Sequence, residues 1–376
     1  MAKKKRARTS EPSRNYQQAH SLLRSKLPLV ISAKGLGLAL AFALIFMVAD
    51  RGIARLLASV THLHASTPEA QEIQNVLSAN NEAYIFGSSR AKHHYDPTIL
   101  QQESGVRFYN AGAEGQDIMY LRMLADLIEK DHQPKLYLVN LSFSDLMKSS
   151  YRFKRVSIFR PYVGQSPVIQ RLLKRFDTHW YEIHRWVHSY DYNTQLGGLL
   201  TAPLAMPLNN GYQPLRRSYD PADNLKQFRL AAQIDEFVLR ELVAFIRQAQ
   251  SKHIQVVLSV GPTYRYYSDF TLSPADWFLL NGIRQTAKVM HVPYIEIPEI
   301  SDIKYRSPDF YADVEHLNEK GASYYSHQVG QQLRGILRLQ TPDDLARSPY
   351  SPGTRVEEYK IPMSIYAPAP EPLAAN

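Results

Sequence analysis

The sequence predicts an α/β protein: a doubly wound, mostly parallel sheet, with a transmembrane helix before it and an aromatic, basic insertion within it. Three observations lead to this fold class. An apolar stretch near the N-terminus is long enough to span a bilayer. Short apolar runs alternate with longer helical patterns across residues 80–340, which is typical of a parallel sheet covered on both faces. Residues 146–224 break that alternation with a composition of their own.

The N-terminal tail, residues 1–28, is basic, and the apolar stretch 29–49 follows it directly. Residues 1–50 contain nine Lys and Arg against two acidic residues, so most of the net charge of +9 belongs to this tail. The apolar stretch has one charge, Lys34, and as a helix it measures about 30 Å. Because the positive flank is N-terminal, we expect a single-pass signal anchor in the cytoplasmic (inner) membrane, with an exported domain, periplasmic or extracellular.

Three alternatives to an anchor remain open. A cleaved signal peptide would use the same apolar run, although its leader is long and Met47-Val48-Ala49 is a poor cleavage site. A buried helix of a soluble protein is the second. The third is a nucleic-acid-binding arm, but we expect no nucleic-acid partner, because the basic tail leads straight into the apolar stretch.

The elements after the anchor are predicted in order along the chain. Residues 50–79 form a stalk and a helix that ends near Ser78, with Ser66 and Glu69 as a capping box and Pro68 in the first turn. The candidate strands are 83–86, 106–109, 136–141, 254–260 and 293–297, and the candidate helices are 116–130, 225–252, 274–291 and 318–339. Residues 341–376 are rich in Pro, Ser and Ala, which predicts disorder.

The insertion, 146–224, combines aromatic and basic residues. Between Lys148 and Arg217 there are eleven Lys or Arg, three Asp or Glu and eleven aromatic residues. Aromatic faces stack on sugars and basic side chains attract anionic polymers or headgroups, so the segment is a candidate polymer-binding surface. The alternative is a cover domain with an aromatic core of its own.

The sequence gives no sign of a metal or a cofactor. It has no cysteine, which excludes a disulfide and a thiolate metal site. His93 and His94 are adjacent, and adjacent residues of a helix face different directions. We therefore expect no metal site and no cofactor.

A serine follows the first candidate strand in the run Gly87-Ser88-Ser89. Ligands of an open parallel sheet bind beyond the carboxyl ends of its strands, and a serine there is exposed. A serine hydroxyl becomes a useful nucleophile when a histidine removes its proton. The alternative is that Ser88 and Ser89 only cap the helix that follows.

Two further motifs stand at the ends of later elements. Asn110-Ala111-Gly112-Ala113-Glu114-Gly115 follows the second strand, and glycines there let backbone N–H groups approach an oxyanion. Asp313-x-x-His316 precedes the last helix, and its carboxylate can hold one imidazole nitrogen while the other stays free. Taken alone, the first is an ordinary turn and the second an ordinary helix start capped by Asn318.

In combination, these motifs resemble the SGNH (GDSL-like) hydrolase family over about residues 80–340. In that family the serine follows the first strand, the glycine of an Asn-x-x-x-x-Gly turn follows the second, and Asp-x-x-His precedes the last helix. The resemblance implies an SGNH/flavodoxin-like sheet, with Ser89 as nucleophile, His316 as base and Asp313 as its orienting carboxylate. It implies oxyanion donors from Ser89 and Gly115. Ser88 stands where the family usually has aspartate.

The third motif of the family departs from its pattern. The family has Gly-x-Asn-Asp after strand three, and the asparagine donates to the oxyanion. Here the run is Asn140-Leu141-Ser142-Phe143-Ser144-Asp145, so Ser144 takes the asparagine position. A missing donor costs about 3 kcal/mol of transition-state stabilisation. Ser144, Asn140 or a group of the insertion is the candidate replacement.

The Gly-Ser-Ser variant, the single anchor and the divergent third motif also resemble the DltD-type proteins, which act beside polytopic membrane O-acyltransferases on envelope polymers. That resemblance implies a serine esterase or O-acyltransferase whose partners are a polysaccharide or teichoic-acid-like polymer and such a membrane protein. The alternative is a non-catalytic, polymer-binding subunit of such a system. Further candidate substrate-binding residues are Arg90, Tyr264 and Arg265.

Overall fold

The computed structural model divides the chain into two compact units, residues 1–52 and 53–376. The basic tail, 1–28, lies outside the described residues. The structure describes residues 32–63, 67–147, 152–193, 195–196, 210–220, 233–264, 273–296, 302–339, 342–350 and 365.

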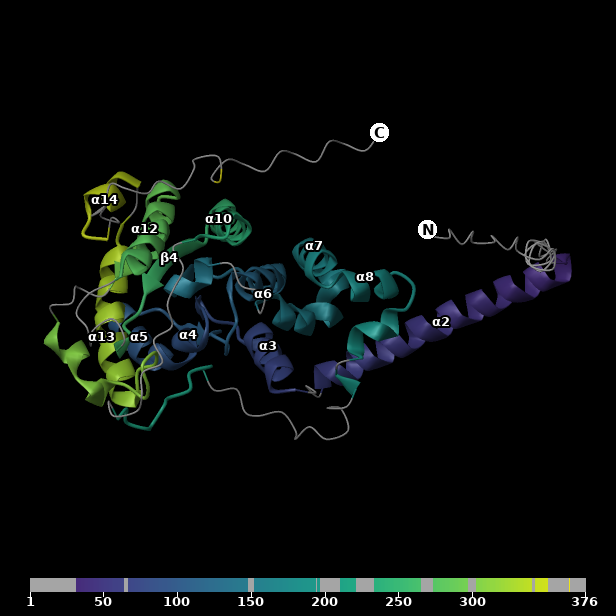
Figure 1. Ribbon diagram of the computed structural model, residues 1–376, viewed down its shortest axis with the longest axis horizontal. Coiled ribbons are helices and arrows are strands. Elements are labelled where there is room, and N and C mark those ends of the chain that lie inside the picture. Colours follow the sequence, from purple (N-terminus) through teal and green to yellow (C-terminus); the bar gives the residue numbers. More distant parts are fainter. Residues whose placement is uncertain are drawn as a thin grey trace, which may run out of the picture. The chain divides into compact units, whose positions relative to one another are not determined.

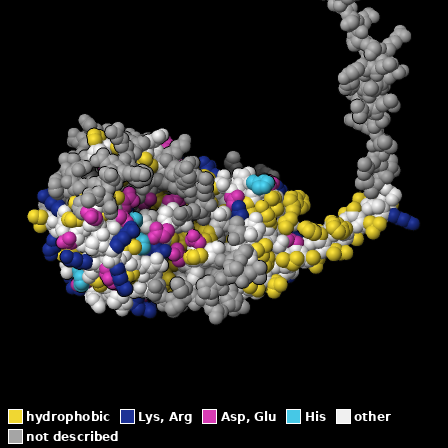
Figure 2. Space-filling view, turned by 60° about the horizontal axis from the view of Figure 1, so that its bottom comes forward, with side chains coloured by type: hydrophobic (Ala, Val, Ile, Leu, Met, Phe, Trp, Pro, Cys, Tyr) yellow, Lys and Arg dark blue, Asp and Glu magenta, His cyan; other side chains and the backbone are white. Residues whose placement is uncertain are grey.

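The apolar stretch forms a single long helix, α2 (Ala33–Leu63). Its segment Ala33–Thr61 has a mean hydropathy of 1.9, and its length and composition allow it to cross a membrane. Figure 2 shows apolar side chains along this helix as a nearly continuous yellow surface. The helix continues past the predicted end at Ala49, so residues 51–63 of the predicted stalk are helical.

Five parallel strands form the sheet of the second unit. Their order is β2-β1-β3-β4-β5, and all four pairings are parallel. This confirms the predicted α/β class with a doubly wound parallel sheet. The bounds lie within two residues of the predicted ones: β1 (Ala83–Phe86), β2 (Phe108–Asn110), β3 (Leu136–Asn140), β4 (Gln255–Val260) and β5 (Tyr294–Glu296).

Each face of the sheet packs against its own set of helices (Figure 1). Strand β1 shows the alternation: Tyr84 and Phe86 belong to one apolar cluster, and Ala83 and Ile85 to the other. The first cluster includes α3 (Pro68–Ser78), α6 (Ile118–Asp131), α10 (Glu236–Ser251) and α12 (Pro274–Val289). The second includes α4 (Ser89–His94), α5 (Pro97–Ser104) and α13 (Glu319–Ile336).

Two helix starts differ from the prediction. The N-cap of α3 is Thr67, whose hydroxyl accepts from the Ala70 N–H, so the capping box with Ser66 is wrong by one residue. Helix α10 begins at Glu236, because the Asp235 carboxylate accepts from the Phe237 N–H and caps it there. Residues 225–232 of the predicted helix lie outside the described residues.

The described part of the insertion is mostly helical, and its aromatic residues are used largely for packing. Phe159 and Trp180 are buried within the first apolar cluster, and the Phe159 ring meets Tyr120 of α6 edge to face at 5.2 Å. Trp186 is different, with 68% of its surface exposed. A cover with an aromatic core therefore describes the insertion better. The short helix η1 (Phe143–Leu146) leads into it, and its described elements are η2 (Arg152–Gln165), α7 (Pro167–Phe176), α8 (Thr178–His184) and η3 (His188–Tyr192).

The segment after Thr341 is partly structured, which differs from the predicted disorder. Residues Pro342–Arg347 form α14, and the Tyr350 carbonyl accepts from the Tyr294 N–H of β5 at 3.1 Å. The Ile365 side chain is buried in the first apolar cluster. Residues 351–364 and 366–376 lie outside the described part of the chain.

Candidate active site

Ser89 is the first residue of α4 and directly follows the turn at the carboxyl end of β1. Gly87 makes this turn with φ of 146°, a conformation that disfavours residues with a side chain. A Cβ atom on Gly87 would come within 2.6 Å of the Asn140 carbonyl oxygen and 2.8 Å of the Ala91 Cβ. Strand β1 lies between β2 and β3, where connections leave the sheet in opposite directions, so Ser89 occupies the switch point of this fold.

Asn110, at the end of β2, fixes the helix that carries Ser89. Its side-chain amide donates to the carbonyl oxygens of Ala91 at 2.7 Å and Tyr95 at 2.9 Å. Its side-chain oxygen accepts from the Gly112 N–H. This buried amide thus joins β2, α4 and the glycine turn, so in the asparagine–glycine motif the asparagine has a structural task.

The loop that carries His316 is held in a narrow fold before α13. The Ala312 N–H donates to the His316 carbonyl at 2.8 Å, and the Asn318 amide donates to the carbonyls of Asp309 and Tyr311. Asn318 also caps α13, since its side-chain oxygen accepts from the Gly321 N–H. The cap and the loop are therefore one hydrogen-bonded unit that aims His316 at α4.

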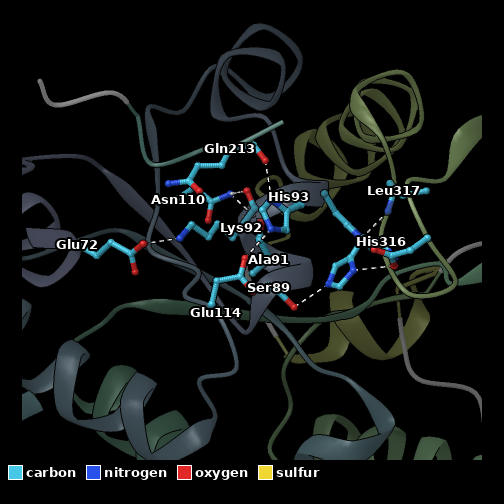
Figure 3. Close-up of polar contacts among 12 residues, drawn as sticks. Glu72, Ser89, Ala91, Lys92, His93, Asn110, Glu114, Gln213, His316 and Leu317 are labelled. Carbon is cyan, nitrogen blue, oxygen red and sulfur yellow. Dashed lines mark hydrogen bonds and ion pairs between the residues drawn. The ribbon is translucent and has the colours of Figure 1, made fainter. Parts of the chain in front are cut away.

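Ser89, His316 and Asp313 form one hydrogen-bonded line. Ser89 Oγ lies 2.8 Å from His316 Nε2, and His316 Nδ1 lies 2.8 Å from Asp313 Oδ1. Figure 3 shows the Ser89 hydroxyl pointing to the His316 ring. With the Nδ1 proton donated to the carboxylate, Nε2 is free to accept the serine proton. The structure thus brings together three residues that are separated by up to 227 positions in the sequence.

Asp313 is held in its ionised form. Partial burial acts to raise its pKa, but the hydrogen bond and charge of His316 outweigh this effect, and the Glu315 N–H and Arg217 add to them. The net result is a pKa well below the ordinary value of an aspartate. Arg217 Nη2 donates to Asp313 Oδ2 at 2.6 Å, so each carboxylate oxygen has its own cationic or imidazole partner.

His94 supports the loop from beneath. Its ring is completely buried, and its Nε2 accepts the Leu317 N–H at 3.0 Å. Burial, followed by the nearby charges of His316 and Arg90, lowers its pKa well below the usual range. A neutral His94 therefore fixes the residue next to His316 without competing for protons.

His93 faces the pocket side of α4. Its Nδ1 lies 2.6 Å from the Gln213 carbonyl oxygen and its Nε2 lies 2.6 Å from Glu114 Oε1 (Figure 3). Its ring meets the His316 ring edge to face at 5.6 Å. The hydrogen bond from His93 lowers the pKa of Glu114. Because a carbonyl oxygen only accepts, the Nδ1 atom of His93 carries a proton.

An extended strap, residues 210–220, closes one side of the site. Its backbone is bonded to that of Asn110, Lys92, Glu319 and Tyr311, which anchors it to four different segments. The strap, Asp313 and His316 line an open pocket of about 550 Å³. The pocket lining is His93, Glu114, Pro214, Leu215, Arg216, Arg217, Asp313 and His316. Figure 2 shows basic, acidic and histidine side chains interspersed on one face of the second unit.

Three of the residues predicted as oxyanion or substrate contacts have partners within the chain. Asn140 is buried, and its amide donates to the Tyr95 hydroxyl at 2.8 Å, while its predicted substrate contact remains an expectation. The Ser144 hydroxyl is paired with Ser142 Oγ at 2.8 Å. Tyr264 packs between the rings of Tyr219 and Tyr311.

Three further predicted residues remain expectations. Gly115 has φ of 60° and follows Ala113, whose N–H donates to the Gly87 carbonyl, so the glycine turn runs beside the turn of Ser89. Arg90 is only 6% exposed, and within the described residues its Nη2 atom has no hydrogen-bond partner. Arg265 lies outside the described part of the chain.

Sequence reasoning missed the strap and its contribution of Arg216 and Arg217. Arg217 is 96 positions from Asp313, and a local spacing pattern does not report such a contact. Glu114 lay within the recognised glycine turn, yet its pairing with His93 needed the fold. The available signal was only the density of Arg in the segment before the fourth strand.

Comparison with known proteins assigns no family. No model of a known protein family and no curated protein matches the chain. A provisionally assigned acylhydrolase from Bacteroides fragilis NCTC 9343 is similar over 73% of this chain and 99% of its own, at 12% identity and a TM-score of 0.36. An acetyl xylan esterase is similar over 68% of this chain and 100% of its own, at 14% identity and a TM-score of 0.35. A provisionally assigned GDSL-like lipase from Parabacteroides merdae ATCC 43184 is similar over 69% of this chain and 99% of its own, at 12% identity and a TM-score of 0.34. Likenesses at this level assign no activity.

Proposed function

We propose that this chain is a membrane-anchored serine esterase or O-acyltransferase of the SGNH type. In this proposal it acts on acyl esters of a cell-envelope polysaccharide or teichoic-acid-like polymer. The observation that supports the catalytic part is the hydrogen-bonded line from Asp313 through His316 to Ser89, with 2.8 Å at each step. A serine, an imidazole and an ionised carboxylate in this order are what acyl transfer through a covalent intermediate requires.

In the first half of the proposed reaction, Ser89 Oγ attacks the ester carbonyl carbon. His316 Nε2 takes the hydroxyl proton as the new C–O bond forms, and Asp313 stabilises the resulting imidazolium through Nδ1. The carbonyl oxygen becomes an oxyanion. When the tetrahedral intermediate collapses, the bond to the leaving alcohol breaks and His316 returns the proton to that alcohol. The acyl group then remains on Ser89.

In the second half, an acceptor hydroxyl attacks the acyl-serine and His316 accepts its proton. If the acceptor is water, the product is a free acid and the reaction is ester hydrolysis. If it is a sugar hydroxyl, the acyl group passes to the polymer. Collapse of the second intermediate returns the proton from His316 to Ser89 Oγ, which restores the starting state.

The oxyanion donors in this proposal are the backbone N–H groups of Ser89 and Gly115. The Gly87 φ of 146° and the Gly115 φ of 60° belong to two turns that the bond from Ala113 to Gly87 places next to each other. Backbone donors fixed in such turns cost no reorganisation when charge develops. Two donors in place of three are consistent with a slow enzyme or with an acceptor that completes the site.

The pocket supports a hydrophilic substrate with a short acyl group. Pro214 and Leu215 are its apolar lining residues, and the other six are charged or titratable. Such a lining gives a long alkyl chain little surface to bury, whereas hydroxyl-rich and anionic groups find donors in Arg216 and Arg217. Helix α2, which is long and apolar enough for a span, supports placement at a membrane surface.

A second candidate is a non-catalytic subunit that binds polymer beside a polytopic membrane O-acyltransferase. The observation that favours it lies at the end of β3. Asn140 is buried against Tyr95, and Ser144 is bonded to Ser142, so each side chain has a hydrogen-bond partner other than Ser89. A fold that keeps a triad but lacks a third oxyanion donor fits a binding role.

Covalent labelling separates the two candidates. The full chain, purified in detergent, is treated with a fluorophosphonate probe, which reacts with serines activated by a base. We expect labelling of the native chain and of Ser88→Ala, and its loss in Ser89→Ala. Ser88 is a matched control, because it precedes the nucleophile directly and makes no side-chain cap. Unlabelled native chain, or equal labelling of Ser89→Ala, would overturn the enzyme proposal.

A further inference from the structure

The insertion contains a cluster of two histidines and one aspartate between α8 and η3. His184 ends α8, and His188 and Asp191 belong to η3. Each residue offers one ligand atom, and these atoms all lie within 4.8 Å of one another. His184 Nδ1 lies 2.8 Å from Asp191 Oδ1. The reaction proposed above uses Ser89, His316 and Asp313, and none of the three cluster residues has a role in it.

The ring geometry fits a shared ion. The centroids of His184 and His188 are 5.2 Å apart, with the planes at 66°. Two imidazoles that bind one tetrahedral ion at about 2.0–2.1 Å hold their centroids about 5 Å apart. Ligand atoms around such an ion lie about 3.4 Å apart, so the most distant pair of the cluster needs to approach by up to about 1.4 Å. His188 stands at the start of η3, four residues after His184.

The side chains around the cluster are packed, and they bury Asp191 and stack on His184. Asp191 is 6% exposed, and a carboxylate at this depth needs compensating positive charge. The His184 ring is stacked on Trp180 at 4.9 Å, and Arg160 covers the same indole. Arg160 is held in turn by Asp177 and Asn193, so the indole that stacks on His184 also packs against a fixed guanidinium.

We propose that His184, His188 and Asp191 bind a divalent transition-metal ion, with Zn²⁺ as the favoured ion, and that the ion joins α8 to η3. Two imidazoles and one carboxylate form a ligand set that suits Zn²⁺, Cu²⁺ and Ni²⁺ and discriminates against Mg²⁺ and Ca²⁺, which prefer oxygen ligands. Three protein ligands leave one tetrahedral position for water or an external oxygen. The three ligands fall within eight residues, so the site forms locally within the insertion.

The test is direct metal binding to the untagged full chain in detergent, after removal of metal by a chelator. Isothermal titration with Zn²⁺ should show one site per chain with a Kd in the micromolar range or below. Millimolar Mg²⁺ should leave that Kd unchanged within about twofold. The melting temperature of the chain should rise in Zn²⁺, because an ion that binds only the folded state stabilises it.

Matched variants assign the site. His188→Ala and the isosteric Asp191→Asn should each weaken Zn²⁺ binding by at least about tenfold. His179→Ala is the control, since His179 is an exposed histidine of the same helix, α8, and it should bind as the native chain does. Circular dichroism checks that each variant is folded. The proposal is overturned if the native chain shows no saturable site, or if folded Asp191→Asn and His179→Ala bind Zn²⁺ equally.

Discussion

Strands β1 and β3 pair side by side, yet their carboxyl ends lead to different outcomes. At the end of β1, Gly87 turns the chain so that Ser89 meets His316 at 2.8 Å. At the end of β3, Asn140 is buried against Tyr95, and the chain enters η1, where Ser142 and Asp145 form a capping box. A polar residue that follows a strand at the carboxyl edge of the sheet therefore does not necessarily face the pocket. The turn that follows the strand decides whether a polar side chain reaches the pocket or stabilises the fold.

The largest effect on kcat is expected at Asp313, whose carboxylate orients the histidine that contacts Ser89 at the end of β1. Asp313→Asn should lower kcat on a small aryl ester by about 10³–10⁴-fold, because an amide cannot hold the imidazole in the required tautomer. The matched change at the β3 end, Asp145→Asn, alters a helix cap and should lower kcat by less than about threefold. Equal losses in the two variants would show that the two strand ends do not differ in function.

The same aspartate gives a dependence of stability on pH with a definite sign. Its pKa in the folded chain lies below the ordinary value of about 3.9. The unfolded chain therefore takes up this proton first as the pH falls. The stabilisation from Asp313 is present above about pH 4 and is lost as the pH falls further toward the folded pKa. In urea unfolding, the gap in the free energy of unfolding between the native chain and Asp313→Asn should narrow below about pH 4. A constant gap down to pH 3 would contradict the shift.

The turn of Gly87 is the next strongest test. Gly87→Ala places a Cβ 2.6 Å from the Asn140 carbonyl oxygen at φ of 146°, and we expect a loss of about 3 kcal/mol in the free energy of unfolding. Gly105→Ala is the control, with φ of 81° and nothing within 4 Å of the added atom, and should cost about 1 kcal/mol. Thermal unfolding of both variants measures the difference. Equal melting temperatures would mean that close packing between the β1 turn and β3 is unimportant.

Alanine variants of the two strap arginines, Arg216 and Arg217, should differ in kcat/KM by a smaller factor than the variants above. Arg217 contacts Asp313 Oδ2 at 2.6 Å, whereas Arg216 faces Glu319 at 3.4 Å. With a neutral ester, Arg217→Ala should lower kcat/KM by about tenfold and Arg216→Ala by about twofold, because both side chains are well exposed and screened. The gap should shrink in high salt. A larger loss of kcat/KM in Arg216→Ala than in Arg217→Ala would show that Arg217 is not the arginine that orients Asp313.

The smallest effect is expected at Ser144. Its hydroxyl is bonded to Ser142 at 2.8 Å, so Ser144→Ala should change kcat by less than about threefold. An oxyanion donor would instead cost about 10²–10³-fold. Steady-state rates of Ser144→Ala decide between these values. A loss in the higher range would restore Ser144 as the replacement for the missing asparagine.

Much of the sheet, and the meeting of Ser89, His316 and Asp313, could be predicted from the sequence, because both depend on local signals. The run Ala83–Phe86 is apolar and ends in a glycine turn, so its bounds were predicted without error. Strand β2 was placed too early, because Asn110 is polar and resembles a turn residue, whereas in the fold it is buried as the clamp on α4. The helix α10 was started too early, because the apolar spacing continues upstream of the Asp235 cap.

What the sequence could not supply were contacts between distant segments. The ion pair of Arg217 with Asp313 and the bond of His93 with Glu114 depend on how the strap and the glycine turn meet α4. The aromatic residues of the insertion were ambiguous for a related reason. Composition reports that Phe159 and Trp180 are aromatic, but only the packing reports that they are buried while Trp186 is exposed.

The acyl-enzyme itself offers the decisive measurement. The full chain is mixed with an aryl acetate, quenched in acid within a turnover, digested and mapped by mass spectrometry. If the alcohol at position 89 is the nucleophile, one acetyl group will be found on the peptide that contains Ser89, and His316→Ala will not acquire it. An unmodified Ser89 in a chain that turns over the ester, or acetyl on another residue at equal rate, would contradict the proposed chemistry.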